Sequence, residues 1–175
     1  MKSFMKCFQT FLRKSLRFLW KALAFLPALF MMWTIFGFSA QPSAVSSQVS
    51  GTVSVTIVEL GERLLNTDWS SRQIQEYARQ LEHFVRKAAH LTEYFLLAVS
   101  LTLPLWFHRL RGWRLALAVG TFCLLFAGLD ELHQAFVPGR SPAVKDVCID
   151  TAGSLGGVFL SMAGARIIGS RKSRP

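Results

Sequence analysis

The sequence predicts an all-α fold: a multi-pass membrane helical bundle of four transmembrane helices, plus an outer amphipathic helix leading into the second span. Hydrophobic residues make up 51% of the 175 residues, with 15 Phe and a mean hydropathy of +0.34, which is typical of integral membrane proteins. Four windows approach the length of about 20 apolar residues that a helix needs to cross about 30 Å of hydrocarbon. Because these windows do not alternate as barrel strands do, we expect helices within one domain, residues 1–175.

The N-terminal segment is basic and precedes the first predicted span, at about residues 22–38. Phe4, Phe8, Phe11 and Leu12 recur at helical spacing, which favours a helix lying on an anionic membrane surface; a solvated basic tail is the alternative. A Ser-, Gln- and Pro-rich stretch ends the span. The same pattern also resembles a cleavable signal peptide, although an apolar core of about 17 residues is longer than such segments usually have.

An amphipathic helix is predicted between the first two spans. Ser70 or Ser71 can cap its start, and no helix breaker separates it from the second span, at about residues 88–107. We therefore expect one continuous helix whose first part rests on the outer membrane surface or covers a site there. Its apolar stripe consists of Ile74, Tyr77, Ala78, Leu81, Val85 and Ala88.

The third span is predicted at about residues 113–132 and the fourth at about residues 147–168. Ser141 followed by Pro142 is a start signal for the fourth helix, with a cap followed by the first helical residue. Within that helix, Gly153 and Gly157 have the spacing that lets another helix backbone approach closely.

The distribution of charge predicts the orientation. Of the 20 Lys and Arg residues, 13 lie before the first span, between the second and third spans, after the fourth, or at the adjoining ends of the third and fourth spans (Arg114 and Arg166), and none of the ten Asp and Glu residues lies there. Cytoplasmic loops are enriched in Lys and Arg, so we expect both termini to lie in the cytoplasm. This sorting by membrane side argues against a nucleic-acid partner and leaves membrane lipids as the expected surroundings.

The three cysteines, Cys7, Cys123 and Cys148, match neither a disulfide framework nor a zinc-ligand spacing, so we interpret them as free thiols.

Polar side chains crowd the predicted outer ends of the second, third and fourth spans. Three sets recur at steps of three or four residues, so each set shares a helix face: Lys87, His90, Glu93 and Tyr94; Asp130, His133 and Gln134; and Asp146 and Asp150. A charged group in the middle of a lipid-facing helix costs about 2.5 to 3.5 kcal/mol, so these faces are expected to point inward and meet. The residues are Lys87, His90, Glu93 and Tyr94 on the second span, Asp130, Glu131, His133 and Gln134 on the third, and Arg140, Asp146 and Asp150 before and within the fourth.

Three motifs occur in order: K-x-x-H-x-x-E-Y from Lys87, D-E-x-x-Q-x-F-x-P-G-R from Asp130 and D-x-x-x-D-x-x-G from Asp146. Together with FSAQPSAVSSQVSG after the first span, they resemble the VanZ family of small bacterial membrane proteins over about residues 22–168. Asp150 stands where members often carry Asn. The resemblance implies a multi-pass protein of the bacterial cytoplasmic (inner) membrane, related to one that accompanies low-level teicoplanin resistance. It implies no established reaction.

The polar cluster has three interpretations. It can be purely structural, with pairs such as Lys87 with Glu93 or Asp150 contributing about 0.6 to 2 kcal/mol each. It can be a site where Lys87, His90 and Arg140 bind an anionic cell-envelope precursor or a glycopeptide. It can also be the site of a membrane-embedded hydrolase or transferase acting on an envelope lipid or precursor, which a divalent metal could assist.

In the enzyme interpretation, His90 is the general base or a metal ligand, and Glu93 and Asp130 are its carboxylate partners. Arg140 would hold the anion, and His133 is expected to face the outer water. No HExxH motif is present, so the sequence identifies no cofactor, and it does not predict the oligomeric state. The other expected ligand-binding residues are Lys87, Tyr94, Glu131, Gln134, Asp146 and Asp150.

Overall fold

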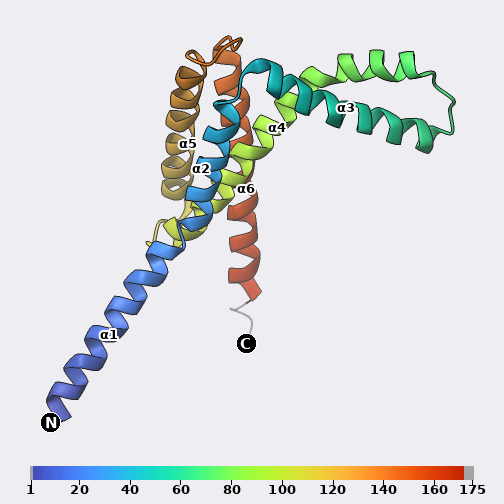
Figure 1. Cartoon of the computed structure of the whole chain (residues 1–175). Coiled ribbons are helices and arrows are strands. Elements are labelled where there is room, and N and C mark those ends of the chain that lie inside the picture. Colours follow the sequence, from blue (N-terminus) through green and yellow to red (C-terminus); the bar gives the residue numbers. More distant parts are fainter. Residues whose placement is uncertain (1, 172–175) are drawn as a thin grey trace.

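The computed structural model describes the backbone of residues 2–171, which forms six helices and contains no strand (Figure 1). Side chains are described at residues 5, 13–16 and 18–164, so the predicted apolar face of Phe4, Phe8, Phe11 and Leu12 lies outside the described side chains. The helices are α1 (Lys2–Leu23), α2 (Leu26–Ser39), α3 (Ser43–Leu65), α4 (Ser71–Phe107), α5 (Gly112–Gln134) and α6 (Val144–Arg171).

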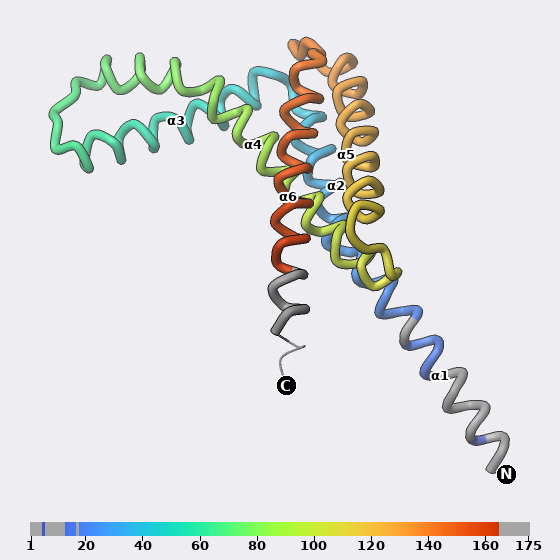
Figure 2. The backbone as a smooth tube through the Cα atoms, turned by 180° about the vertical axis from the view of Figure 1, so that it is seen from behind, coloured from blue at the N-terminus to red at the C-terminus, as the bar shows by residue number. Residues whose placement is uncertain are grey.

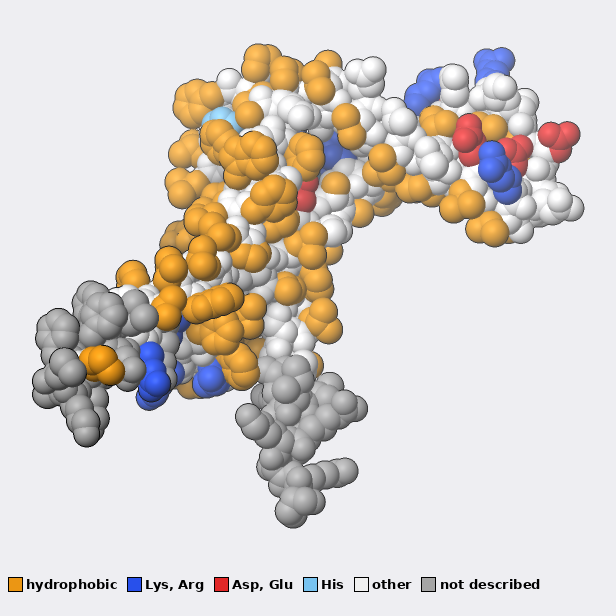
Figure 3. Space-filling model, turned by 60° about the horizontal axis from the view of Figure 1, so that its bottom comes forward, with side chains coloured by type: hydrophobic (Ala, Val, Ile, Leu, Met, Phe, Trp, Pro, Cys, Tyr) orange, Lys and Arg blue, Asp and Glu red, His pale blue; other side chains and the backbone are white. Residues whose placement is uncertain are grey.

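Four stretches are long and apolar enough to cross a membrane, as the sequence predicts. They are Arg13–Ser39, Ser71–Phe107, Gly112–Gln134 and Val144–Gly164. Helices α2, α5, α6 and the second half of α4 lie side by side as a bundle (Figures 1 and 2). In Figure 1, α1 and the last turns of α6 leave the bundle at the same end. The flanks of the bundle expose large apolar side chains, as a lipid-facing surface does (Figure 3).

Helix α3 is the main departure from the sequence-based expectation, which assigned no helix to residues 43–65. The Ser-, Gln- and Pro-rich stretch interrupts the apolar run only up to Pro42, and a helix of 23 residues then begins at Ser43. It ends at Asn66, whose φ of 52° is a left-handed C-cap. Helix α3 and residues 71–86 of α4 run antiparallel and project from the bundle; we call this pair the arm, and the end of the bundle from which it projects the arm end (Figures 1 and 2).

Helix α4 confirms that the amphipathic helix continues into the second span. Its 37 residues make it about 55 Å long, which exceeds the hydrocarbon thickness of about 30 Å, so its first half extends beyond the bundle. Ser70 caps the helix in a reciprocal capping box with Gln73. Part of the predicted apolar stripe is covered where α4 packs against α3: Ala78 is buried, whereas Tyr77 and Ala88 are exposed. Beside it, Ser50 of α3 donates a hydrogen bond to Glu82.

Two helix starts differ from the predicted ones. The first span contains a break at Ala24 and Phe25, and α2 then begins at Leu26 with Pro27 in its first turn, where proline is tolerated. The start signal at Ser141 and Pro142 is wrong, because α6 begins at Val144.

The predicted contact face of α6 is confirmed. A Cβ atom at Gly153 would clash with the carbonyl oxygen of Leu91, and one at Gly157 would clash with that of Phe95, so the backbones of α4 and α6 meet there. The same helices and α5 enclose the apolar core around Leu97, Val119 and Val158. This close contact fixes the position of the α4 side chains relative to those of α6 at the arm end.

Candidate functional site

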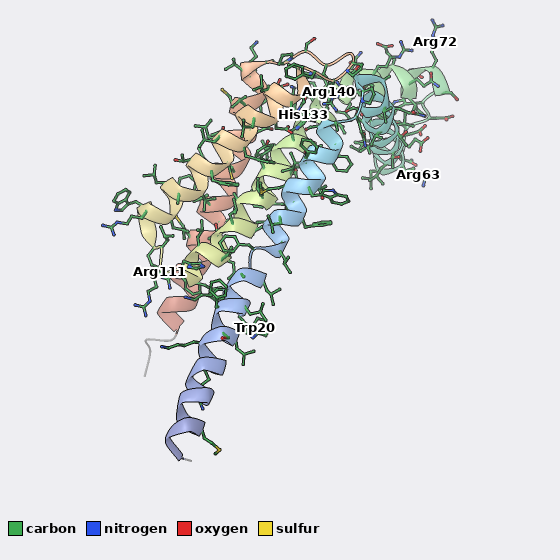
Figure 4. All side chains as sticks on the ribbon, turned by 60° about the vertical axis from the view of Figure 1, so that its left-hand side comes forward. Trp20, Arg63, Arg72, Arg111, His133 and Arg140 are labelled. Atoms are coloured by element: carbon green, nitrogen blue, oxygen red, sulfur yellow. The ribbon has the colours of Figure 1, made fainter. Side chains whose placement is uncertain are left out.

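The polar residues of the three spans converge at the arm end of the bundle. Figure 4 shows His133 and Arg140 at this end, whereas Trp20 and Arg111 lie at the opposite end. Lys87 of α4 forms an ion pair with Asp146 of α6. Lys87 therefore pairs with neither Glu93 nor Asp150, the two partners that the sequence suggested. The packing of α4 against α6 determines which carboxylate lies next to Lys87, and the spacing of residues along one helix does not.

One turn further into the bundle, His90 lies between two carboxylates. Its Nδ1 is 3.8 Å from Oε2 of Glu93 and 4.0 Å from Oδ1 of Asp150. The second carboxylate near the imidazole is therefore Asp150. Asp130, which the sequence suggested for that role, makes its hydrogen bonds elsewhere.

Asp130 forms a buried network with α2. Its Oδ2 accepts hydrogen bonds from Ser39 Oγ at 2.7 Å and from Gln134 Nε2 at 3.0 Å. Gln134 Nε2 also donates to Ser39 Oγ at 3.2 Å. Sequence reasoning did not single out Ser39, although its place at the polar end of the first span was the available signal. Because Ser39 is only 1% exposed, α2 is an integral part of the site.

Arg140 connects the loop before α6 to the end of α2. Its guanidinium donates to Gln134 Oε1 at 3.1 Å, to the Phe38 carbonyl at 3.0 Å and to the Gln41 carbonyl at 3.2 Å. Burial lowers the pKa of Arg140, but a guanidinium stays charged at any physiological pH. Arg140 therefore contributes a permanent positive charge while it satisfies carbonyl groups at the end of a helix.

Three further predicted site residues are buried or half-buried: Glu131, Tyr94 and His133. Glu131 Oε1 accepts a hydrogen bond from the Ala143 N–H at 2.5 Å and so caps the start of α6. Tyr94 is fully buried in the core. His133 does not face the outer water as expected, because α2 brings Phe36 against it and the two rings stack with centroids 4.4 Å apart.

A cleft of about 230 Å³ lies beside these residues, between α2, α3 and α4. One part of its wall is polar and is formed by Arg86, His90, Glu93 and Arg140. The other part is apolar. The larger apolar side chains there are Phe38, Val49, Val53 and Val85.

Arg86 is a cleft residue that the sequence analysis did not select. Its Nη2 donates to Glu82 Oε1 at 2.6 Å and to Ser47 Oγ at 2.7 Å. Its place one residue before Lys87, the first position of the motif on the second span, was a usable signal. The contact with Ser47 could not be foreseen, since it requires α3.

Several buried polar atoms at the arm end have no hydrogen-bond partner among the described residues. A buried polar group left in this state costs about 1 to 3 kcal/mol, so a polar ligand or bound water would stabilise it. These atoms are Arg86 Nε, His90 Nδ1, Tyr94 Oη, Asp130 Oδ1, His133 Nδ1 and Asp150 Oδ1.

A family model described as VanZ/LLP1 matches residues 24–167 of this sequence. The chain belongs to the VanZ/LLP1 family. The match covers most of the chain and includes all three motifs on which the resemblance rests. No curated protein and no solved structure matches the sequence.

The VanZ/LLP1 motifs separate into cleft residues and supporting residues. His90 and Glu93 from the first motif and Arg140 from the second line the cleft. Several other motif residues support the site, as the ion pair of Lys87 with Asp146 and the cap provided by Glu131 illustrate. Within the described part of the chain, no three His, Cys, Asp or Glu side chains are gathered as metal ligands, so the divalent-metal hypothesis gains no support from the arrangement.

Proposed function

We propose that this VanZ/LLP1 protein binds the anionic group of an amphipathic cell-envelope molecule in the cleft between α2, α3 and α4. The observation that carries the proposal is the composition of the cleft wall, which combines two arginines with four larger apolar side chains. Guanidinium groups bind carboxylate and phosphate oxygens with paired hydrogen bonds, and apolar walls accept the lipid part of the same molecule.

The buried position of the charged groups supports binding at this site. Arg86 Nε is a donor without a partner among the described residues, and Arg86 and Arg140 both border the cleft. The carboxylate of Glu93 and the imidazole of His90 lie on the same wall and would orient the ligand. An envelope lipid, an envelope precursor and a glycopeptide such as teicoplanin share the required chemistry, an anionic group next to apolar surface. Sequestration of a glycopeptide would give resistance.

The site would face the outside of the cytoplasmic membrane. The positive-inside rule places the basic segments before the first span, between the second and third spans and after the fourth in the cytoplasm. Both termini would then be cytoplasmic, and the arm end would lie at the outer leaflet, where envelope precursors and glycopeptides are present.

The test uses the full-length protein in phosphatidylcholine nanodiscs and the variant Arg86→Gln, with Arg79→Gln as the matched control. Arg79 lies two turns earlier on α4 and is exposed, with a Glu76 partner at 3.9 Å. Phosphatidic acid and teicoplanin serve as separate probes, and binding is measured by microscale thermophoresis. Loss of a charge-assisted hydrogen bond of about 1.5 to 3 kcal/mol predicts at least tenfold weaker binding to Arg86→Gln and unchanged binding to Arg79→Gln.

Removing Arg86 also removes the ion-pair partner of Glu82, so the double variant Glu82→Gln, Arg86→Gln provides a second measurement. Equal affinity of Arg86→Gln and Arg79→Gln for both probes would contradict the proposal. Binding of only one probe would identify the ligand class.

A second candidate function is hydrolysis of an envelope phosphate ester, with His90 as the general base. The observation that favours it is the imidazole at the cleft wall, with Glu93 and Asp150 within 4.0 Å to stabilise its protonated form. Wild-type protein and His90→Gln would be incubated with phosphatidic acid in the presence and absence of Mg²⁺, and released phosphate would be measured. This function predicts phosphate release that His90→Gln abolishes while the affinity for phosphatidic acid is retained; no release by the wild type would rule it out for this substrate.

A further inference from the structure

Helix α3 exposes a continuous apolar stripe that no described residue covers. Its members recur every three or four residues, and their exposed fractions range from 43% to 78%. The stripe consists of Val45, Val49, Val53, Ile57, Leu60 and Leu64. A surface of this kind on a helix that leaves the bundle requires a partner, because exposing it to water is unfavourable.

Helix α3 has three distinct faces. One face packs on α4 and is made of small or buried side chains, including Ser50, Ser54 and Val58. A second face is polar and exposed, and includes Gln48, Thr52 and Thr56. The apolar stripe is the third face and lies beside the polar one. An apolar face next to a polar face is typical of a helix that lies in a membrane interface.

The position of the arm places α3 at the level of a membrane surface. In Figures 1 and 2, the arm extends sideways from one end of the bundle. Helix α3 lies on the side of the arm that faces the opposite end of the bundle, and the first half of α4 lies on the other side. In Figure 4, Arg72 of α4 and Arg63 of α3 lie on opposite sides of the arm. Because the spans must lie in hydrocarbon, α3 is the side of the arm that meets the leaflet.

The stripe is continuous with the lipid-facing surface of the bundle. Val49 and Val53 border the cleft together with Phe38 of α2, which is itself exposed. Figure 3 shows hydrophobic side chains continuing from the flank of the bundle along one edge of the arm, next to acidic and basic side chains on the rest of the arm's visible face. Near the turn that joins α3 to α4, the rings of Trp69 and Tyr77 lie 5.1 Å apart. Trp and Tyr favour the boundary between lipid and water.

We propose that the lipid leaflet at the arm end is the partner of this stripe, so that α3 lies in the headgroup region with its apolar face among the acyl chains. The first half of α4 then lies above α3 with its charged side chains in water. Because Val49 and Val53 belong to both the stripe and the cleft wall, this placement also puts one edge of the cleft at the level of the lipid headgroups. The inference does not depend on what the cleft binds.

The test measures the depth of single spin labels on α3 by electron paramagnetic resonance in liposomes of phosphatidylcholine and phosphatidylglycerol. Cys7 and Cys148 are replaced by Ser in the full-length chain, and Cys123 is fully buried and therefore protected from the reagent. Labels at Leu60→Cys and Ile57→Cys report on the stripe, and labels at Thr52→Cys and Gln48→Cys are the matched controls on the polar face. Accessibility to oxygen, which concentrates in lipid, is compared with accessibility to a water-soluble nickel complex.

We expect the Leu60 and Ile57 labels to collide at least several times more often with oxygen than with the nickel complex, and the Thr52 and Gln48 labels to show the reverse. Similar nickel accessibility on both faces would place α3 in water and overturn the inference. Protection of the stripe labels from both reagents would mean that protein covers the stripe, and it would overturn the inference as well. If Arg86→Gln bound both probes as tightly as Arg79→Gln while the labels showed the expected depths, the proposed function would fail and this inference would stand.

Discussion

At the scale of single residues, the structure assigns different tasks to side chains that are close in the sequence. Asp130 and Glu131 are neighbours, yet Asp130 bonds to Ser39 of α2 while Glu131 caps α6 through Ala143. Their side chains point in different directions from the end of α5, so each joins a different neighbouring segment. Helix periodicity shows that two adjacent residues cannot share a face, but it does not show which partner each one meets.

The cap provided by Glu131 gives a prediction at this scale. Glu131→Ala removes the acceptor for the Ala143 N–H and should lower stability by about 0.5 to 2 kcal/mol, as loss of a helix cap does. Glu131→Gln keeps an oxygen in the same place and should retain most of that stability. The measurement is thermal unfolding of the purified protein in detergent. Equal destabilisation by Ala and Gln would show that the charge matters and not the cap.

Arg140 gives a second prediction because its three acceptors lie on other segments. Arg140→Lys keeps the positive charge but cannot reach Phe38, Gln41 and Gln134 with one planar group. We therefore expect a lower melting temperature and reduced membrane yield for Arg140→Lys, whereas Arg79→Lys, at an exposed position, should behave as the wild type. An unchanged melting temperature for Arg140→Lys would mean that these hydrogen bonds contribute little to stability.

At the scale of elements, the contact between α4 and α6 determines which polar groups meet. The close approach at Gly153 and Gly157 sets the vertical register of the two helices, and that register brings Asp146 to Lys87 and Asp150 to His90. A small-residue face thus does more than allow tight packing. It aligns the charged groups of α4 and α6 next to the cleft.

Substitution of the interfacial glycine tests this alignment. Gly153→Ala places a methyl group against the Leu91 carbonyl and should cost about 1 to 3 kcal/mol through overpacking. Gly128→Ala is the control, because a Cβ there meets no atom within 4 Å and alanine favours helix. Folded yield in membranes and thermal unfolding measure the difference. Equal behaviour of the two variants would argue against the close α4 and α6 contact.

At the scale of the whole molecule, the bundle has two different ends. The polar cluster, the cleft and the arm lie at one end, and α1 and the last turns of α6 leave from the other (Figure 1). Among the described residues, the short link between α4 and α5, which includes Arg109 and Arg111, also lies at the end opposite the arm. The basic segments named by the sequence analysis thus meet at one end, as an even number of spans requires.

The orientation of the whole molecule can be measured directly. We expect a fluorescent protein fused after Pro175 to fluoresce in cells, and an alkaline phosphatase fused at the same point to be inactive, because the C-terminus is predicted to be cytoplasmic. In a chain with Cys7 and Cys148 replaced by Ser, Arg72→Cys, on the arm, should react with a membrane-impermeant maleimide applied to intact cells, and Arg109→Cys should react only after lysis. The reverse labelling pattern would place the cleft on the cytoplasmic side.

The sequence by itself determined the all-helical class, four apolar segments, the continuous amphipathic helix and second span, the glycine contact face and the VanZ family resemblance. Each of these depends on local composition or on periodicity along one helix, which a chain shows without its fold. The sequence also placed Lys87, His90, Asp130 and Asp150 at one end of the bundle.

Tertiary structure alone decided which side chains pair and where the cleft lies. Ser39 meets Asp130 across 91 positions, Arg140 reaches Phe38 across 102, and Arg86 meets Ser47 on a helix that the sequence analysis did not assign. Such contacts depend on how the helices are rotated and shifted against one another, and spacing along a single helix carries no information about either. Helix α3 was missed for a related reason: its serines suggest a loop, yet several of them are small side chains that pack against α4.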